Sequence, residues 1–188
     1  MKNLIVYQGK YGATTQYAQW LAEEFPLPVY RAESFDGNKL EQAGLLVMGS
    51  SVYIGKLQIS RWVNKYLNQL HGHKLILFVV SGTPLNEKEK LLKYVTSSLP
   101  EQITDRCRIF YLPGRLVYNK LSWKDRLLLR IGAMFAGTSE ENKKMLQGYD
   151  DVKKEHLAAI SNEISRLLKE QQTESVEVAV SAKTTNAQ

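Results

Sequence analysis

The sequence predicts an α/β fold built on a doubly wound, five-stranded parallel sheet. Short apolar runs of strand-forming residues recur along the chain, with helical segments between them. Two of these runs, Gly44–Gly49 and Leu75–Ser81, are almost continuously apolar, which is typical of strands covered on both faces. Alternating strands and helices with right-handed crossovers give the strand order 2-1-3-4-5 that we expect here.

Each element has its own local signal. Leu4–Tyr7 is the first predicted strand, and Val29–Ala32 is a short second one that follows Pro26 and Pro28. Gly44–Gly49, Leu75–Ser81 and Arg108–Leu112 are the third to fifth strands. Apolar residues at helical spacing predict the helices between and after these strands: Thr14–Phe25, Ser60–Leu70, Glu87–Leu99 and Asp151–Gln171.

Composition places the chain among globular proteins with one domain. It has 188 residues, a net charge of +6 and one cysteine, Cys107, so no disulfide forms within the chain. We expect Cys107 to be inert core packing. No run approaches the roughly 18 apolar residues of a membrane-spanning helix, and the N-terminal apolar run is too short for a signal peptide, so we expect a cytoplasmic protein. We predict a domain over residues 1–172, an insert over about 114–148, and a disordered polar tail over 173–188.

The segment Lys2–Ala18 predicts a phosphate site. The first strand turns through Gly9 and Gly12 into Thr14 and Thr15, which open a helix. A helix start presents unpaired backbone N–H groups and the positive end of the helix dipole, and both favour an anion.

Two further loops are expected beside this one. Gly49–Gly55 follows the third strand, and Ser81–Pro84 follows the fourth. In an open parallel sheet, ligands bind at the carboxyl ends of the strands, near the point where the strand order reverses. All three loops are rich in glycine or hydroxyl residues, and the second adds the aromatic ring of Tyr53.

On these loops the chain resembles the flavodoxin-like FMN proteins. Gly12 and Thr14 match the family's phosphate loop, whereas Gln8 and Lys10 replace its usual small hydroxyl residues; the charge of Lys10 would compensate for lost donors. The resemblance implies noncovalent FMN, with Tyr53 stacked on the flavin ring and the Ser81 loop along its pyrimidine edge. The residues expected to bind FMN are Gln8, Lys10, Tyr11, Gly12, Ala13, Thr14, Thr15, Ser50, Ser51, Val52, Tyr53, Gly55, Ser81, Gly82 and Thr83.

More narrowly, the chain is similar to the quinone-linked, flavodoxin-type protoporphyrinogen IX dehydrogenases of haem biosynthesis. The shared motifs are Lys10-x-Gly12-x-Thr14, Gly49-x-Ser51-x-x-x-Gly55, the run Trp123–Arg126 in the long insert, and Gly137-Thr138-Ser139. The resemblance implies an enzyme that takes electrons from a reduced tetrapyrrole and passes them to a quinone. It does not identify catalytic residues.

The insert predicts a basic amphipathic helix. Ser122 is its expected N-cap, with the Asp125 side chain reaching back as in a capping box. Such a helix suits an anionic membrane surface or an acidic substrate, while packing against its own domain is the alternative. The residues expected to contact substrate or membrane are Arg115, Lys120, Trp123, Lys124, Arg126 and Arg130.

Two other functions stay open: a flavodoxin-type electron carrier, and a flavin-dependent quinone reductase. Carriers of this kind are usually acidic, whereas this chain has a pI near 9.3, which points away from the plain carrier. The chain lacks the acidic residues of a receiver domain and the Gly-Lys-Ser/Thr of an NTPase loop, and only Gly9 and Gly12 match a dinucleotide fingerprint. His71 and His73 are more simply exposed residues than metal ligands. We expect no metal and no nucleic acid.

Overall fold

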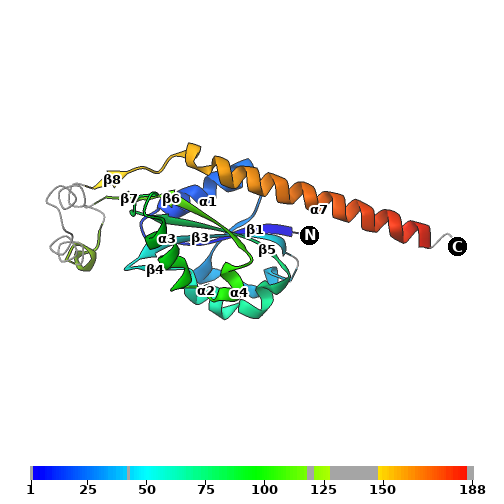
Figure 1. Cartoon of the computed structure of the whole chain (residues 1–188), viewed down its shortest axis with the longest axis horizontal. Coiled ribbons are helices and arrows are strands. Elements are labelled where there is room, and N and C mark those ends of the chain that lie inside the picture. Colours follow the sequence, from blue (N-terminus) through cyan, green and yellow to red (C-terminus); the bar gives the residue numbers. More distant parts are fainter. Residues whose placement is uncertain (1, 42, 118–120, 128–147, 186–188) are drawn as a thin grey trace.

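The computed structural model describes residues 2–41, 43–117, 121–127 and 148–185. Its principal strands are β1 (Lys2–Gln8), β2 (Val29–Arg31), β3 (Ala43–Tyr53), β5 (Lys74–Ser81) and β6 (Cys107–Pro113). They pair in parallel in the order β2-β1-β3-β5-β6, which confirms the predicted topology. Figure 1 shows β1, β3, β5 and β6 between the layers of helices. Tyr7 lies opposite Gly49, and Ser51 lies opposite Val80, so β1, β3 and β5 end side by side.

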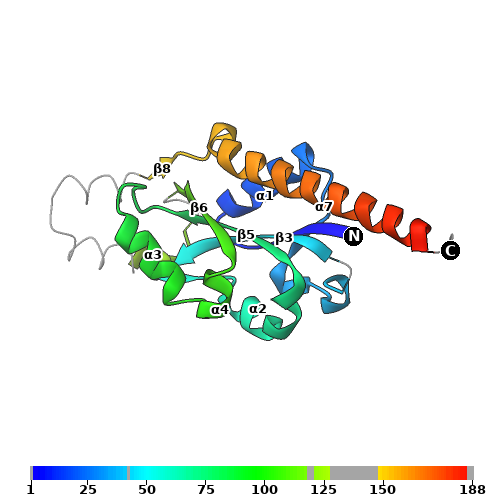
Figure 2. The same ribbon diagram turned by 45° about the vertical axis from the view of Figure 1, so that its right-hand side comes forward.

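Helices cover both faces of the sheet (Figure 2). On one face lie α1 (Ala13–Glu24) and α7 (Ala158–Thr185), preceded by the short 3-10 helix η5 (Lys154–Leu157). Their apolar residues pack on β1, β3 and β5, and Tyr17, Leu21, Ile160 and Ile164 are fully buried there. Helices cover both faces of the sheet, so the strands carry apolar side chains on both faces. This explains the near-continuous apolar runs at residues 44–49 and 75–81.

The other face is covered by α2 (Ser60–Lys65), α3 (Lys88–Thr96) and α4 (Glu101–Thr104). The 3-10 helices η1 (Ala32–Ser34), η2 (Gly37–Lys39) and η3 (Leu67–Gly72) complete this side. Phe35, Trp62 and Tyr66 pack edge to face or tilted against one another in this core, with ring centroids 5.2–5.8 Å apart. The prediction of one helix over Ser60–Leu70 is therefore corrected to α2 followed by η3.

Three short strands lie beside the loops at the carboxyl end of the sheet. β4 (Lys56–Leu57) folds back on β3, with Val52 opposite Leu57. β7 (Arg115–Leu116) pairs antiparallel with β8 (Tyr149–Asp150), with Arg115 opposite Asp150. The predicted insert thus leaves and rejoins the domain at one point, beside the carboxyl ends of β5 and β6.

The last helix differs from its prediction at both ends. The segment from 151 begins with irregular chain and η5 rather than with a continuous helix, and α7 runs past Gln171 to Thr185 (Figure 1). Residues 158–185 contain neither Gly nor Pro, so nothing in the sequence stops the helix at 171. The division into a 1–172 domain and a tail stays a prediction. Among the described residues, no helix is long and apolar enough to cross a membrane.

Candidate functional site

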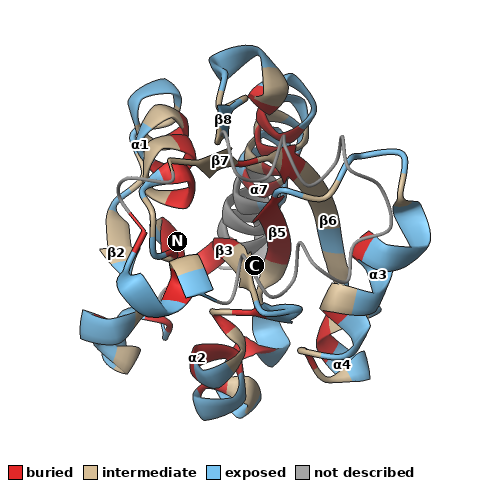
Figure 3. Cartoon of the chain, turned by 90° about the vertical axis from the view of Figure 1, so that its left-hand side faces the viewer, coloured by how far each residue is buried: buried red, intermediate tan, exposed pale blue. Residues whose placement is uncertain are grey.

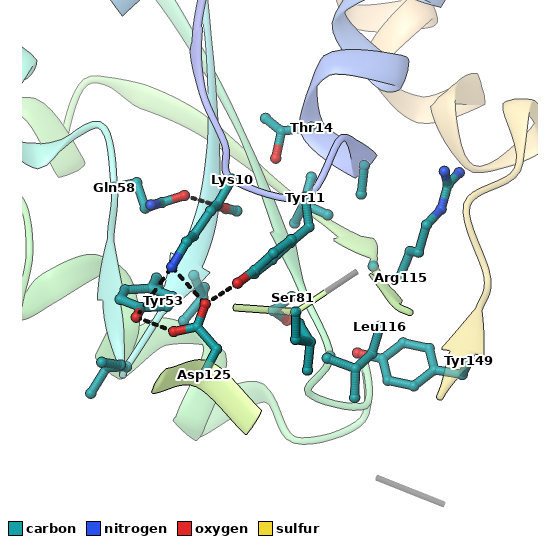
Figure 4. A pocket seen from close by; sticks show the side chains of 18 of the residues that line it. Lys10, Tyr11, Thr14, Tyr53, Gln58, Ser81, Arg115, Leu116, Asp125 and Tyr149 are labelled. Atoms are coloured by element: carbon teal, nitrogen blue, oxygen red, sulfur yellow. Dashed lines mark hydrogen bonds and ion pairs between the residues drawn. The ribbon is translucent and has the colours of Figure 1, made fainter. Parts of the chain in front are cut away.

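Figure 3 shows α1 and α7 on one side of the sheet and α2 and α4 on the other. A cavity of about 580 Å³ opens at the carboxyl ends of β1, β3 and β5 (Figure 4). The three predicted loops and both described edges of the insert form its walls. The lining residues are Lys10, Tyr11, Ala13, Thr14, Ser51, Val52, Tyr53, Ile54, Gly55, Gln58, Val80, Ser81, Gly82, Gly114, Arg115, Leu116, Leu121, Asp125 and Tyr149.

The first loop leaves donors at the start of α1 without partners among the described residues. Gly12 is the N-cap residue, it has a φ of +87°, and no side chain in the described part of the chain caps the helix. The Thr14 side chain is buried, and its Oγ1 has no hydrogen-bond partner within the described chain. A Cβ on Gly9 would lie 2.6 Å from that oxygen, so glycine is required for Thr14 to take this place. The loop therefore holds a buried hydroxyl and open N–H groups on the cavity.

The second loop is the tight β3–β4 connection. Ile54 and Gly55 have φ values of 49° and 71°, and the Ile54 side chain is 68% exposed. Ser51 donates through Oγ to Gln58 Oε1. Ser50, in contrast, is fully buried behind the cavity, where its Oγ accepts from the Ile59 N–H at 3.2 Å. This arrangement leaves Tyr53 as the aromatic side chain that the loop presents to the cavity.

The third loop holds a second unpaired hydroxyl. Ser81 is 6% exposed, and its Oγ lacks a hydrogen-bond partner among the described residues. A Cβ on Gly82 would collide with the Tyr149 hydroxyl, so β8 packs directly over this loop. Thr83 turns away from the cavity, because its Oγ1 pairs with the Tyr94 hydroxyl at 3.1 Å.

The insert brings a buried carboxylate into the site. Asp125 is 7% exposed and accepts from Lys10 Nζ at 2.6 Å, from the Tyr53 hydroxyl at 2.5 Å and from the Tyr11 hydroxyl (Figure 4). Because the Lys10 ammonium donates to this carboxylate, the pKa of Lys10 is raised. The backbone N–H of Asp125 donates to Ser122 Oγ at 3.2 Å, which confirms Ser122 as a cap.

The predicted capping-box role of the Asp125 side chain is wrong. Three side-chain donors, one of them charged, hold a carboxylate more strongly than a single backbone N–H does. The carboxylate consequently turns into the cavity instead of back along the helix of residues 123–127.

Arg115, where the insert leaves the domain, contacts both β8 and α1. Its Nε lies 3.0 Å from Asp150 Oδ2, and its Nη2 donates to Gln16 Oε1 on α1. The guanidinium therefore bridges β7, β8 and α1 beside the cavity.

The structure brings ten of the fifteen predicted FMN residues to the cavity: Lys10, Tyr11, Ala13, Thr14, Ser51, Val52, Tyr53, Gly55, Ser81 and Gly82. The lining does not include Gln8, Gly12, Thr15, Ser50 or Thr83. Gln8 instead donates to Glu33 Oε1 at 2.7 Å on the neighbouring surface. Neighbouring side chains on a strand point to opposite faces, so Ser51 lines the cavity whereas Ser50 lies behind it.

Of the predicted substrate or membrane residues, Arg115 lines the cavity. Trp123, Lys124 and Arg126 lie on the adjoining helix outside the lining, and Lys120 and Arg130 lie outside the described residues, as does the 137–139 motif. Sequence reasoning missed eight of the residues that line the cavity: Ile54, Gln58, Val80, Gly114, Leu116, Leu121, Asp125 and Tyr149. The signal available for Asp125 was that it is the one acid in the basic stretch from Arg115 to Arg130. Of the two histidines considered above as metal ligands, His73 pairs through Nδ1 with the Ala43 carbonyl at 2.7 Å. The described residues hold no cluster suited to a metal.

The site fits the phosphate and ring of a flavin mononucleotide in its chemistry. Thr14 and the N-terminal amides of α1 offer donors for a phosphate, and Ser81 offers a buried hydroxyl for a polar ring edge. Tyr53, Val52 and Leu116 supply aromatic and apolar walls.

Comparison with known proteins identifies the family. A flavodoxin domain model matches residues 4–143, so the chain belongs to the flavodoxin domain family. The comparison with curated proteins gives no match.

Solved structures of two flavodoxins and of an oxidoreductase are also similar to the chain. A flavodoxin from the domain Archaea shares 19% identity, with 77% of this chain and 100% of that chain covered and a TM-score of 0.38. Flavodoxin 1 from Bacillus cereus shares 14% identity, with 78% and 93% covered and a TM-score of 0.40. Rubredoxin oxygen:oxidoreductase from Desulfovibrio gigas shares 16% identity, with 78% and 34% covered and a TM-score of 0.40. The family assignment therefore rests on the domain match.

Proposed function

We propose that this flavodoxin-like protein binds one FMN in the cavity and works as an FMN-dependent oxidoreductase. Two buried hydroxyls carry the proposal: those of Thr14 and Ser81, which have no partner among the described residues and lie on two loops of one cavity in a flavodoxin-domain chain. Buried polar groups in proteins nearly always have partners, and a bound flavin supplies partners for both.

The chain's residues then have distinct binding roles. The amides from Lys10 to Thr15 and the Thr14 hydroxyl hold the phosphate. Tyr53 with Ser51 and Val52 packs on the ring, and Ser81 and Gly82 contact the ring's polar edge. When bound, the flavin supplies the redox chemistry, by accepting and releasing electrons. The protein's part is to position it and to exclude water from it.

We further propose that the electrons come from a reduced tetrapyrrole of the protoporphyrinogen type and pass to a quinone. The support is the position of the insert. Leu116, Leu121 and Tyr149 add apolar lining to the cavity, and the Arg115 guanidinium, which also contacts Asp150, lines it as well. An apolar, multiply carboxylated macrocycle needs both kinds of contact. The basic charge of the chain favours the same class of substrate.

The exposed side of the insert supports a peripheral contact with a membrane, where quinones reside. Trp123 is 71% exposed and Leu127 is 51% exposed, and Lys124 lies with its ammonium over the Trp123 ring. Aromatic, aliphatic and basic side chains together suit the interface of an anionic bilayer. The inner face of the cell membrane is the location that we propose.

The test is anaerobic turnover of protoporphyrinogen IX by the FMN-loaded protein with menaquinone as acceptor. We expect protoporphyrin fluorescence to rise well above the spontaneous rate. We also expect Lys124→Glu to weaken turnover on anionic vesicles, while Lys88→Glu, an exposed lysine on α3, does not. A rate equal to the spontaneous oxidation would remove the dehydrogenase assignment. Rapid electron transfer to a partner protein without turnover would instead establish a carrier.

A further inference from the structure

Asp125 is the only acid among the described residues that line the cavity, and three side chains donate to its carboxylate. Lys10 Nζ at 2.6 Å, the Tyr53 hydroxyl at 2.5 Å and the Tyr11 hydroxyl all donate to it, and its side chain is only 7% exposed. Lys10 and Tyr11 belong to the phosphate loop, Tyr53 belongs to the ring-side loop, and Asp125 belongs to the insert. One carboxylate thus links three separate walls of the cavity.

The Lys10 ammonium interacts with Asp125 and with the Tyr53 ring and hydroxyl. It lies 4.5 Å from the centroid of the Tyr53 ring and 3.5 Å from the Tyr53 hydroxyl, in addition to its contact with Asp125. The only cation of the phosphate loop between Gln8 and Thr15 is therefore neutralised by a buried acid. A lysine already paired in this way has little charge left for a phosphate.

We propose that Asp125 is a specificity-determining residue of the flavin site. By holding Lys10, Asp125 limits how much the ligand's phosphate contributes to binding affinity. This inference rests on the proposed flavin site. The loop then recognises the phosphate through Thr14 and backbone amides, and discrimination between FMN and uncharged riboflavin is weaker than a free lysine would give. A carboxylate on the insert thereby sets the charge selectivity of a loop 115 residues away in sequence.

The measured quantity is the ratio of the dissociation constant of riboflavin to that of FMN, from quenching of flavin fluorescence. Ring contacts affect both ligands equally, so this ratio isolates the phosphate. The variants are Asp125→Asn, Lys10→Met and the double variant, with Asp105→Asn, an exposed acid on the C-terminal side of α4, as the charge-matched control. Asparagine keeps the shape of Asp125: its Oδ1 can accept from one of the two tyrosine hydroxyls, and its Nδ2 can donate to the other.

We expect Asp125→Asn to raise the ratio about tenfold, because a lysine without its acid forms a charge-assisted bond with phosphate. Lys10→Met and the double variant should both stay within about twofold of the parent ratio, because Asp125 acts through Lys10. Asp105→Asn should not change it. Raising the salt concentration should reduce the gain of Asp125→Asn, since the new contact is ionic.

Three results would overturn the proposal. They are an unchanged or lower ratio in Asp125→Asn, an equal rise in the double variant, and a fall of about fivefold or more in Lys10→Met. The third result also decides the question if Asp125→Asn fails to fold. Absence of binding of either flavin to the folded parent chain would instead remove the proposed function, so the two failures are distinguishable.

Discussion

Replacing Thr14 with valine separates the stability of the chain from its binding function. The Thr14 side chain is 1% exposed, and its Oγ1 has no partner among the described residues. Valine has nearly the same shape and a similar helix propensity, so the change removes the hydroxyl and little else. The folded chain without ligand should gain stability, and the flavin complex should lose a phosphate contact.

Both magnitudes follow from the burial of this hydroxyl. A buried polar group without a partner costs about 1–3 kcal/mol, and we expect Thr14→Val to recover about 1 kcal/mol of unfolding free energy, because small shifts already relieve part of the cost. A hydrogen bond to a charged phosphate contributes about 1.5 kcal/mol, so FMN affinity should fall about tenfold. Riboflavin affinity should stay nearly constant.

Urea unfolding of the flavin-free protein and flavin titration measure the two effects. Thr15→Val is the matched control, because Thr15 lies outside the cavity lining and should change neither quantity by much. The reasoning is refuted if Thr14→Val destabilises the flavin-free chain by 1 kcal/mol or more, or if it leaves FMN affinity unchanged, since Oγ1 would then already be satisfied.

Three further predictions concern the rest of the fold. Burial raises the pKa of Cys107 to about 12, so its alkylation at pH 8 should be about 30-fold slower than for an ordinary thiol, and guanidinium should abolish the difference. Gly49→Ala should destabilise the chain by about 2 kcal/mol or more in urea titrations, because a Cβ there meets the buried Phe78 ring; a neutral result would contradict this packing. Arg166 lowers the pKa of Glu163, so this pair stabilises the fold above about pH 4.5 and the stabilisation is lost as the pH falls through the lowered pKa. Glu163→Gln should therefore cost about 0.5 kcal/mol at pH 7 and little at pH 3; an equal cost at both would show that charge is not the cause.

The sheet was predictable because its signals are local. The apolar runs at residues 44–49 and 75–81, together with the glycine-rich turn at Gly9 and Gly12, are enough to predict parallel strands and a phosphate loop. The end of α7 was not predictable from polarity alone, because a polar segment without Gly or Pro continues a helix readily.

The far wall of the cavity was harder to predict. Asp125 has the local signature of a capping box, and its actual partners, Lys10 and Tyr53, are 115 and 72 residues away in sequence. Tyr149 reaches Gly82 because β8 pairs with β7, and a two-residue strand has no signal of its own. Local patterns thus predict the walls made by the parallel strands, whereas tertiary contacts decide the walls made by the insert.

The most direct test of this account is a titration of the purified, flavin-free chain with FMN, followed by flavin fluorescence and by the visible spectrum of the isolated complex. We expect one FMN per chain, with quenched fluorescence, and weaker binding in Thr14→Val. A folded chain that binds no FMN at near-millimolar concentration would contradict the account, and only the flavodoxin-like architecture would stand.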